Sequence, residues 1–133
     1  MKYLLDTNIC IRILKGNSES IHDHIGKLKN KDICIPAIVR YELLYGAYKS
    51  NQPEKTAGIL DSFLSHFPSA MFDDNTARVC GEIRALLDKK GTPIGPDDLI
   101  IAATALSRNL ILVTHNTKEF SRIKGLKLED WET

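Results

Sequence analysis

The sequence predicts an α/β fold in which helices cover both faces of a parallel sheet. Short apolar runs alternate along the chain with longer segments whose apolar residues recur at helical spacing. The short runs are continuously apolar rather than alternating, which is typical of strands that are buried on both faces. The length of 133 residues is that of one domain, so we expect residues 1–133 to form a single domain.

The first half of the chain contains two expected strands and four expected helices. The first four elements, in the order strand, helix, helix and strand, lie at residues 2–6, 8–15, 18–30 and 32–35. Pro36 opens a helix that runs to about Lys49, because proline is favoured in the first helical turn. Pro53 opens the next helix, whose buried face is expected to contain Ile59, Leu60, Phe63, Leu64 and Phe67.

In the second half, residues 69–73 are compatible with a third short strand. Asn75 or Thr76 is expected to cap the following helix, which Gly91 ends. Its apolar residues repeat at helical spacing and are Val79, Cys80, Ile83, Leu86 and Leu87. The remaining elements, a loop, an Ala-rich helix, a strand, a short helix and a last strand, lie at residues 91–96, 97–108, 110–114, 118–123 and 126–128.

The composition excludes several classes of protein. Hydrophobic residues make up 43% and charged residues 26%, which is globular, and the net charge of +1 argues neither for nor against a polyanionic partner. The three separated cysteines indicate free thiols in a reducing compartment. The apolar stretch at residues 99–106 is too short to span a bilayer, and Asp6 interrupts the apolar N-terminus, so no signal peptide is predicted. We expect a cytoplasmic protein without a membrane partner.

Asp6 ends the first expected strand, where function is expected in this fold class. In open α/β sheets, functional groups gather beyond the carboxyl ends of the strands. Aspartate is also a favoured N-cap residue. Taken alone, Asp6 is therefore equally compatible with a site and with a cap for the helix that follows.

Glu42 lies in an expected helix that is apolar almost all round. Residues three and four apart share a helix face, which places Glu42 beside Ile38, Val39 and Tyr45. A carboxylate on an apolar face loses hydration and needs a partner or a metal ion. Arg40 is two positions away and does not face Glu42, so a functional role is favoured over an ion pair.

Two further groups complete the candidate set. Asp97 and Asp98 open the Ala-rich helix, where each stabilises the helix N-terminus by roughly 0.3–1 kcal/mol, and periodicity does not decide which of them faces the sheet. Asn116 follows the strand at residues 110–114 and could ligate or orient a water, or cap the next helix. His115 beside it could act as a base, although a lone loop histidine is more often a surface residue.

If Asp6, Glu42 and one of the Asp97/Asp98 pair converge, they need a countercharge. Two unit charges about 4 Å apart repel by roughly 4 kcal/mol at an effective dielectric constant of about 20, so a proton or a cation must bind. The ligands are all oxygens, which predicts Mg²⁺ or Mn²⁺ rather than Zn²⁺ and indicates phosphoryl chemistry. The chain has no GxxxxGK[ST] or GxGxxG motif, which disfavours an NTPase or a dinucleotide enzyme.

Four segments, each weak alone, occur in a characteristic order. They are YLLDTN, RYELLYG, IGPDDLIIAA and LVTHNTKEF, at residues 3–8, 40–46, 94–103 and 112–120. Together they resemble PIN-domain ribonucleases, and more closely the VapC toxins of bacterial type II toxin–antitoxin systems. The resemblance covers nearly the whole chain.

The resemblance implies a three-layer α/β/α sandwich with a short central parallel sheet. It also implies Mg²⁺-dependent endonucleolytic cleavage of structured RNA, such as the anticodon loop of initiator tRNA, with Mn²⁺ able to substitute. The implied partners are a VapB antitoxin, whose C-terminal segment covers the active-site groove, and a second copy of the chain in a homodimer.

By position in these motifs, Asp6, Glu42 and Asp98 correspond to the family's first three acids. Asn116 occupies the position of the fourth, where many relatives carry aspartate. We expect Asp6, Asp98 and Glu42 to hold the metal ion, Glu42 to help activate the attacking water, and Asn116 to position that water. The candidate phosphate contacts are Arg12, Lys15, Arg40 and Lys118.

Two alternatives remain at this point. A structure-specific DNA nuclease is disfavoured because the chain lacks the long insertions and basic arch of such enzymes. The second alternative is a catalytically degenerate module that only binds RNA or a partner protein. Mg²⁺-dependent RNA cleavage that EDTA removes would distinguish the enzyme from such a module, which would not cleave RNA.

Overall fold

A computed structural model of the chain describes residues 1–132. The elements follow in the order β1 (Tyr3–Leu5), α1 (Thr7–Lys15), α2 (Glu19–Gly26), the 3₁₀ helix η1 (Asn30–Asp32), β2 (Ile33–Cys34), α3 (Ala37–Tyr48), α4 (Pro53–Leu64), α5 (Asp74–Lys90), α6 (Pro96–Ser107), β3 (Ile111–Val113), α7 (Thr117–Phe120) and β4 (Leu128–Glu129). No helix in this described part is long and apolar enough to cross a membrane.

The four strands form one parallel sheet in the order β2-β1-β3-β4. Leu4 of β1 pairs with Cys34 of β2 and with Leu112 of β3, and Leu112 pairs in turn with Leu128 of β4. The central strands are fully buried at Leu4 and Leu112, as the continuous apolar runs predict.

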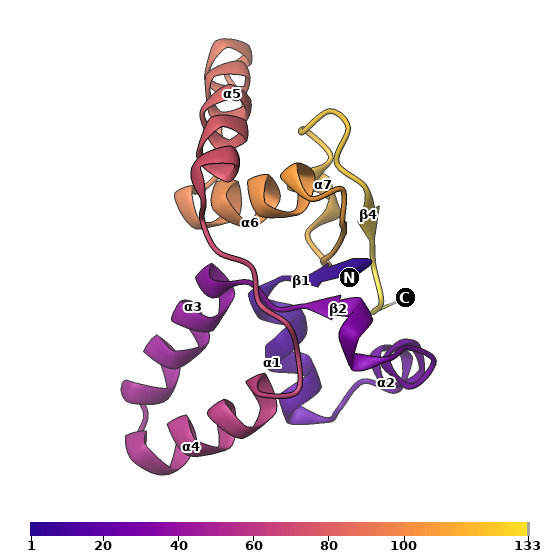
Figure 1. The fold of residues 1–133 in the computed structure, drawn as a ribbon, viewed down its shortest axis with the longest axis vertical. Helices are drawn as coiled ribbons and strands as arrows, with labels where there is room; N and C mark the ends of the chain where they lie inside the picture. The colour runs from indigo at the N-terminus through magenta and orange to yellow at the C-terminus, as the bar shows by residue number, and fades with distance from the viewer. Residues whose placement is uncertain (133) are drawn as a thin grey trace.

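Helices cover both faces of the sheet (Figure 1). α1, α2, α3 and α4 lie on one side, and α5 and α6 lie on the other. α6 approaches closely because its inward face carries small residues, and Ala102, Ala103 and Ala105 are completely buried. The predicted α/β/α sandwich with a parallel sheet is confirmed.

The segment at residues 69–73 is not a strand, so that prediction is wrong. Its neighbourhood makes two separate backbone hydrogen bonds to the segment that follows β2, where the amides of Ile35 and Ala37 donate to the carbonyls of Pro68 and Ala70. The Arg40 guanidinium donates hydrogen bonds to the carbonyls of Phe67 and Pro68. The backbone is thus satisfied without a continuous ladder.

Asp73, and not Asn75 or Thr76, caps α5. The Asp73 Oδ1 atom accepts from the Thr76 backbone N–H at 2.9 Å and from the Thr76 hydroxyl at 2.8 Å. Thr76 lies inside the first turn and is fully buried. The sequence offered a run of good capping residues, and the packing of Thr76 decided which one is used.

Two expected buried faces are only partly correct. Ile59 of α4 is 58% exposed and Leu86 of α5 is 56% exposed, whereas Leu60, Leu64, Ile83 and Leu87 are buried. α4 packs mainly on α3, and α5 packs mainly on α6. A helix with a single neighbour buries a narrow stripe, so the outer apolar positions remain at the surface.

Several element boundaries also differ from the expected ones. α2 ends at Gly26, four residues before the expected end of the helix at 18–30, and η1 covers Asn30–Asp32, from the last residue of that segment up to β2. α7 covers Thr117–Phe120 and β4 covers Leu128–Glu129, so both are displaced by one to three residues from the predictions. The three cysteines are free, as expected, and Cys10 and Cys34 are buried.

Candidate active site

Asp6 lies at the carboxyl edge of the sheet, directly after β1. Its Oδ1 atom accepts from the Ile9 backbone N–H at 2.9 Å, so Asp6 does cap α1. The side chain also hydrogen-bonds to the hydroxyl of Thr114, the residue that follows β3. Asp6 is only 6% exposed, and this burial raises the pKa of its carboxyl group despite the two hydrogen bonds.

Glu42 reaches the same region from α3. The Thr7 hydroxyl donates to Glu42 Oε1 at 2.8 Å, across 35 residues of sequence. The partner that the Glu42 carboxylate requires on its apolar helix face is therefore a neutral hydroxyl rather than a cation. This contact holds one carboxylate oxygen beside the start of α1 and leaves Oε2 with no protein hydrogen bond among residues 1–132.

Asp98 lies in the first turn of α6 and completes the predicted trio. Burial is the largest cause that raises the pKa of Asp98 to about 6. The charges of Glu119, Asp6, Glu42 and Asp97 follow, in that order, as further causes. Three carboxylates from other segments and the neighbouring Asp97 thus act on Asp98, and the acids from the first, third and sixth helical regions meet at one edge of the sheet.

Glu119 of α7 was not selected from the sequence, although its charge acts on Asp98 more strongly than that of Asp6 or Glu42. The Asn116 side-chain amide donates to Glu119 Oε2 at 3.0 Å, so Asn116 orients a carboxylate. Asn116 is also the N-cap residue of α7, but its side chain makes no cap hydrogen bond. The signal in the sequence was the three-residue spacing, which places Asn116 and Glu119 on neighbouring positions of one turn.

The acids at this edge have no basic partner. The ion pairs of Lys and Arg among residues 1–132 join Arg12 to Glu132 and Arg108 to Asp73, and the His115 ring contacts Asp130 and Glu132. None of them includes Asp6, Glu42, Asp98 or Glu119. Carboxylates that are partly buried, mutually repulsive and unpaired with protein cations form a site that favours a hard divalent cation.

His115 belongs to a neighbouring cluster at the ends of β3 and β4. Its Nδ1 atom lies 3.0 Å from Asp130 Oδ2 and 3.5 Å from Glu132 Oε2. In the described part of the chain, this is the one group of three ligand atoms that all lie within 4.8 Å of one another. The Asp6, Glu42 and Asp98 oxygens are spread more widely, a spacing that suits an ion that keeps several of its waters.

Two of the four candidate phosphate contacts are engaged within the protein. The Arg40 guanidinium is half-buried and donates to the carbonyls of Ile35, Leu64, Phe67 and Pro68. Arg12 pairs with Glu132 at 3.2 Å. Lys15 and Lys118 are exposed.

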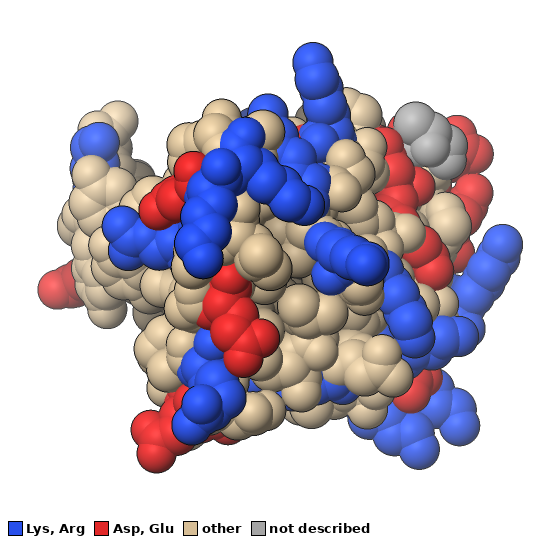
Figure 2. All heavy atoms as spheres, turned by 90° about the horizontal axis from the view of Figure 1, so that it is seen from above, with Lys and Arg blue, Asp and Glu red and all other residues tan. Residues whose placement is uncertain are grey.

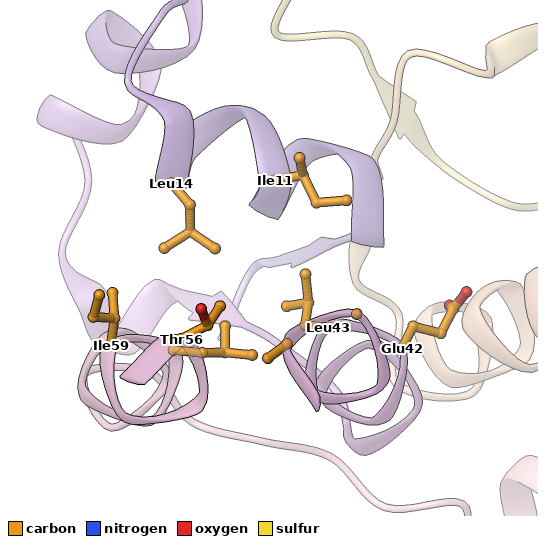
Figure 3. Close-up of a pocket in the computed structure, with 9 residues that line it drawn as sticks. Ile11, Leu14, Glu42, Leu43, Thr56 and Ile59 are labelled. Carbon is orange, nitrogen blue, oxygen red and sulfur yellow. The ribbon is translucent and has the colours of Figure 1, made fainter. Parts of the chain in front are cut away.

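An apolar groove of about 300 Å³ runs between α1, α3 and α4 and leads to Glu42. Its lining residues are Ile11, Leu14, Glu42, Leu43, Gly46, Ala47, Thr56, Ile59 and Leu60. Figure 3 shows Ile11 and Leu14 directed from α1 toward the other two helices, with the Glu42 carboxylate at one end. Leu14 and Ile59 are large apolar residues left exposed at this groove.

Residues 3–126 match the PIN domain family. The chain therefore belongs to the PIN-domain family, as the four segments of the sequence indicated, and it groups with the VapC members of that family. PIN-domain ribonucleases are metal-dependent, in agreement with an edge of acids that lack basic partners.

The relatives by sequence are named as ribonucleases. The tRNA(fMet)-specific endonuclease VapC of Salmonella typhimurium is 43% identical over 131 residues, which cover 98% of each chain. Ribonuclease VapC2 of Rickettsia felis is 42% identical over 133 residues and 99% of each chain. Among solved structures, the chain is similar to the DNA-bound VapBC complex of Salmonella typhimurium, with a TM-score of 0.92, 43% identity and 98% coverage of both chains.

Proposed function

We propose that this protein is a Mg²⁺-dependent endoribonuclease toxin that a VapB antitoxin neutralises. The observation that carries the proposal is the set of acids at the carboxyl edge of the sheet, whose charges act on Asp98 and which no lysine or arginine neutralises among residues 1–132. The names of the VapC relatives support ribonuclease activity.

Asp6, Asp98 and Glu42 would hold the ion, with Mn²⁺ able to substitute for Mg²⁺. The bound ion would supply a water of lowered pKa and would offset the charge of the scissile phosphate. Asp6 is held in place by the Ile9 amide and the Thr114 hydroxyl. This anchoring keeps one carboxylate fixed while the substrate exchanges.

Glu42 would act on the attacking water. Thr7 occupies Oε1, so Oε2 is the atom that would accept the proton from water as its oxygen attacks phosphorus. The bond from phosphorus to the 3′-oxygen would break in line, and the leaving 3′-oxygen would take a proton from solvent water, which leaves a 5′-phosphate and a 3′-hydroxyl. Asn116 would act through Glu119, whose carboxylate it orients, and Glu119 would position water at Asp98.

The proposed substrate is structured RNA, with the anticodon loop of initiator tRNA as the first target to test. The Shigella flexneri and Salmonella typhimurium relatives, at 42% and 43% identity, carry tRNA(fMet)-specific endonuclease in their names. Their matches to this chain cover 98% of each protein.

We place the antitoxin in the groove between α1, α3 and α4. The groove is apolar and ends at Glu42, so an apolar segment that fills it would also cover the acids. The comparable solved structures are VapBC complexes. A homodimer in the cytoplasm completes the proposal, supported by the exposed Tyr41, Tyr45 and Tyr48 along one face of α3.

The test is cleavage of tRNA(fMet) by the purified chain with Mg²⁺, and again with EDTA. We expect cleavage with 5′-phosphate products, lost in EDTA and reduced at least about 100-fold by Asp98→Asn, since removal of a charged metal ligand typically costs this much. The matched control, Asp97→Asn, removes the same charge one residue away and should keep most of the activity. Binding without cleavage would instead identify a degenerate RNA-binding module, and cleavage of DNA alone would identify a DNA nuclease.

A further inference from the structure

A basic patch lies where the end of α5 meets the chain that follows α7. We define the patch as Lys90, Arg122, Lys124 and Lys118. The first three line a shallow hollow of about 50 Å³ together with apolar residues of α5, and no acidic side chain lines it. Figure 2 views the molecule from the side on which α5 ends, where blue lysine and arginine side chains surround a tan surface with some red acidic side chains among them.

These cations are not used by the fold. Arg12 and Arg108 each have a carboxylate partner, whereas none of the four patch residues takes part in an ion pair within residues 1–132. Arg122 donates to the Pro93 carbonyl at 3.1 Å, which fixes its guanidinium without neutralising it. Exposed, unneutralised positive charge of this kind attracts a polyanion.

The patch is continuous with the candidate active site along α7. The Arg122 backbone N–H donates to the Glu119 carbonyl at 3.2 Å, so the two residues are one helical turn apart. Lys118 directly precedes Glu119. The patch therefore adjoins Glu119, the acid whose charge acts most strongly on Asp98.

We propose that the basic patch binds the phosphate backbone of a double-helical arm of the RNA substrate, outside the cleavage centre. This inference rests on the proposed function and specifies its substrate as folded RNA. The patch offers charge and one exposed leucine, Leu86, but no aromatic ring on which an unpaired base would stack. Such a surface suits an A-form helix, which proteins contact mainly through phosphates and 2′-hydroxyls.

The test is binding of full-length tRNA(fMet) by fluorescence anisotropy over a range of salt concentrations, in an Asp98→Asn background that prevents cleavage. We expect Lys90→Gln/Lys124→Gln to weaken binding about tenfold near 0.1 M salt and to lower the salt slope by one to two, since each phosphate contact contributes close to one. The control is Lys29→Gln/Lys31→Gln, which removes equal charge from two exposed lysines in and beside η1.

The patch variant and the control variant are then compared for RNA cleavage in the chain that keeps Asp98. We expect Lys90→Gln/Lys124→Gln to raise KM for the intact tRNA, with less effect on KM for a short anticodon-loop oligonucleotide. Equal affinity and equal salt slope for the patch and control variants would overturn the inference. Patch-dependent tRNA binding by a chain that cuts no RNA would uphold the inference and overturn the proposed function, so the two failures are distinguishable.

Discussion

Asp98 combines partial burial with the charges of four other carboxylates, and each of these raises its pKa. Its position at the start of α6 accounts for the burial, since Leu99 and Ile101 beside it pack into the core. Asp97 makes a contrast, because it shares the same turn and its charge is the last among the causes that act on Asp98. One residue of displacement on a helix separates the proposed metal ligand Asp98 from Asp97, an acid that favours the helix N-terminus.

The raised pKa of Asp98 predicts a loss of cleavage on the acidic side. Asp98 must be ionised to hold a cation, so activity should fall as the pH drops through about 6. Because a bound cation favours the ionised form, higher Mg²⁺ concentrations should shift the midpoint to lower pH. The measurement is the pH profile of kcat/KM at two Mg²⁺ concentrations. A midpoint that does not move with Mg²⁺ would argue against Asp98 as a ligand.

Glu119 gives a second prediction for a single residue. Glu119→Gln removes the charge that acts most strongly on Asp98, so the pH midpoint should move lower while kcat falls about 10- to 100-fold. Asn116→Ala should cause a smaller loss of kcat because it only releases Glu119. The control is Glu82→Gln, which removes the same charge from an exposed position on α5. Full activity in Glu119→Gln would exclude the proposed role of Glu119.

At the scale of elements, α3 carries a residue that supports the fold and a residue proposed for the site, and their side chains point in different directions. Arg40 points toward the end of β2 and the end of α4, where it donates to four carbonyls. Glu42, two residues further on, points toward Thr7 of α1. The two directions follow from the helical rotation of about 100° per residue, so α3 joins the core to the site.

Arg40→Met should destabilise the protein without changing the chemistry of the site. Four carbonyls would lose a charged donor, and we expect a loss of about 3 kcal/mol in the free energy of unfolding. Arg40→Lys should recover little, since one ammonium cannot reach four acceptors. Urea unfolding measures both, with exposed Arg78→Met as the control. An unchanged midpoint for Arg40→Met would mean that these hydrogen bonds contribute nothing.

The groove between α1, α3 and α4 predicts which substitution in this chain would weaken the binding of an antitoxin. Leu14 is 40% exposed at the groove, and Leu14→Glu places a charge on an apolar docking surface. We expect at least a tenfold loss of affinity for a VapB antitoxin that inhibits the parent chain, measured by titration calorimetry. Leu86→Glu, the same change at an exposed position outside the groove, should bind normally. Equal binding by both variants would place the antitoxin elsewhere.

At the scale of the whole molecule, a net charge of +1 conceals a separation of charge. Acids gather at the carboxyl edge of the sheet and after β4, and unpaired cations lie beyond α5 and α7. The acids repel one another, and the divalent cation proposed to bind at this edge would relieve that repulsion.

Mg²⁺ should therefore stabilise the fold. At an ion concentration ten times the dissociation constant, we expect about 1.4 kcal/mol, equivalent to a rise of about 3–5 °C in Tm. Asp98→Asn should abolish most of this rise. In EDTA its Tm should exceed that of the parent above pH 6, because the pKa of Asp98 is raised by folding and its ionised form opposes folding. Thermal unfolding by circular dichroism measures both effects.

The sequence by itself determined the parallel α/β architecture and the candidate acids Asp6, Glu42 and Asp98, because these depend on residue type and short-range spacing. The choice of Asp98 over Asp97 came from the resemblance to PIN-domain ribonucleases, since periodicity left it open.

Only the tertiary structure decided which groups meet. It gave Glu42 the Thr7 hydroxyl as partner, placed Glu119 beside Asp98, and turned Arg40 into the core. The same holds for the conformation of residues 69–73, the exposure of Ile59 and the choice of the residue that caps α5, because each depends on neighbours distant in the sequence. Contacts between segments that lie tens of residues apart leave no periodicity in the sequence, and burial, which sets the pKa of Asp98, exists only once those segments have packed.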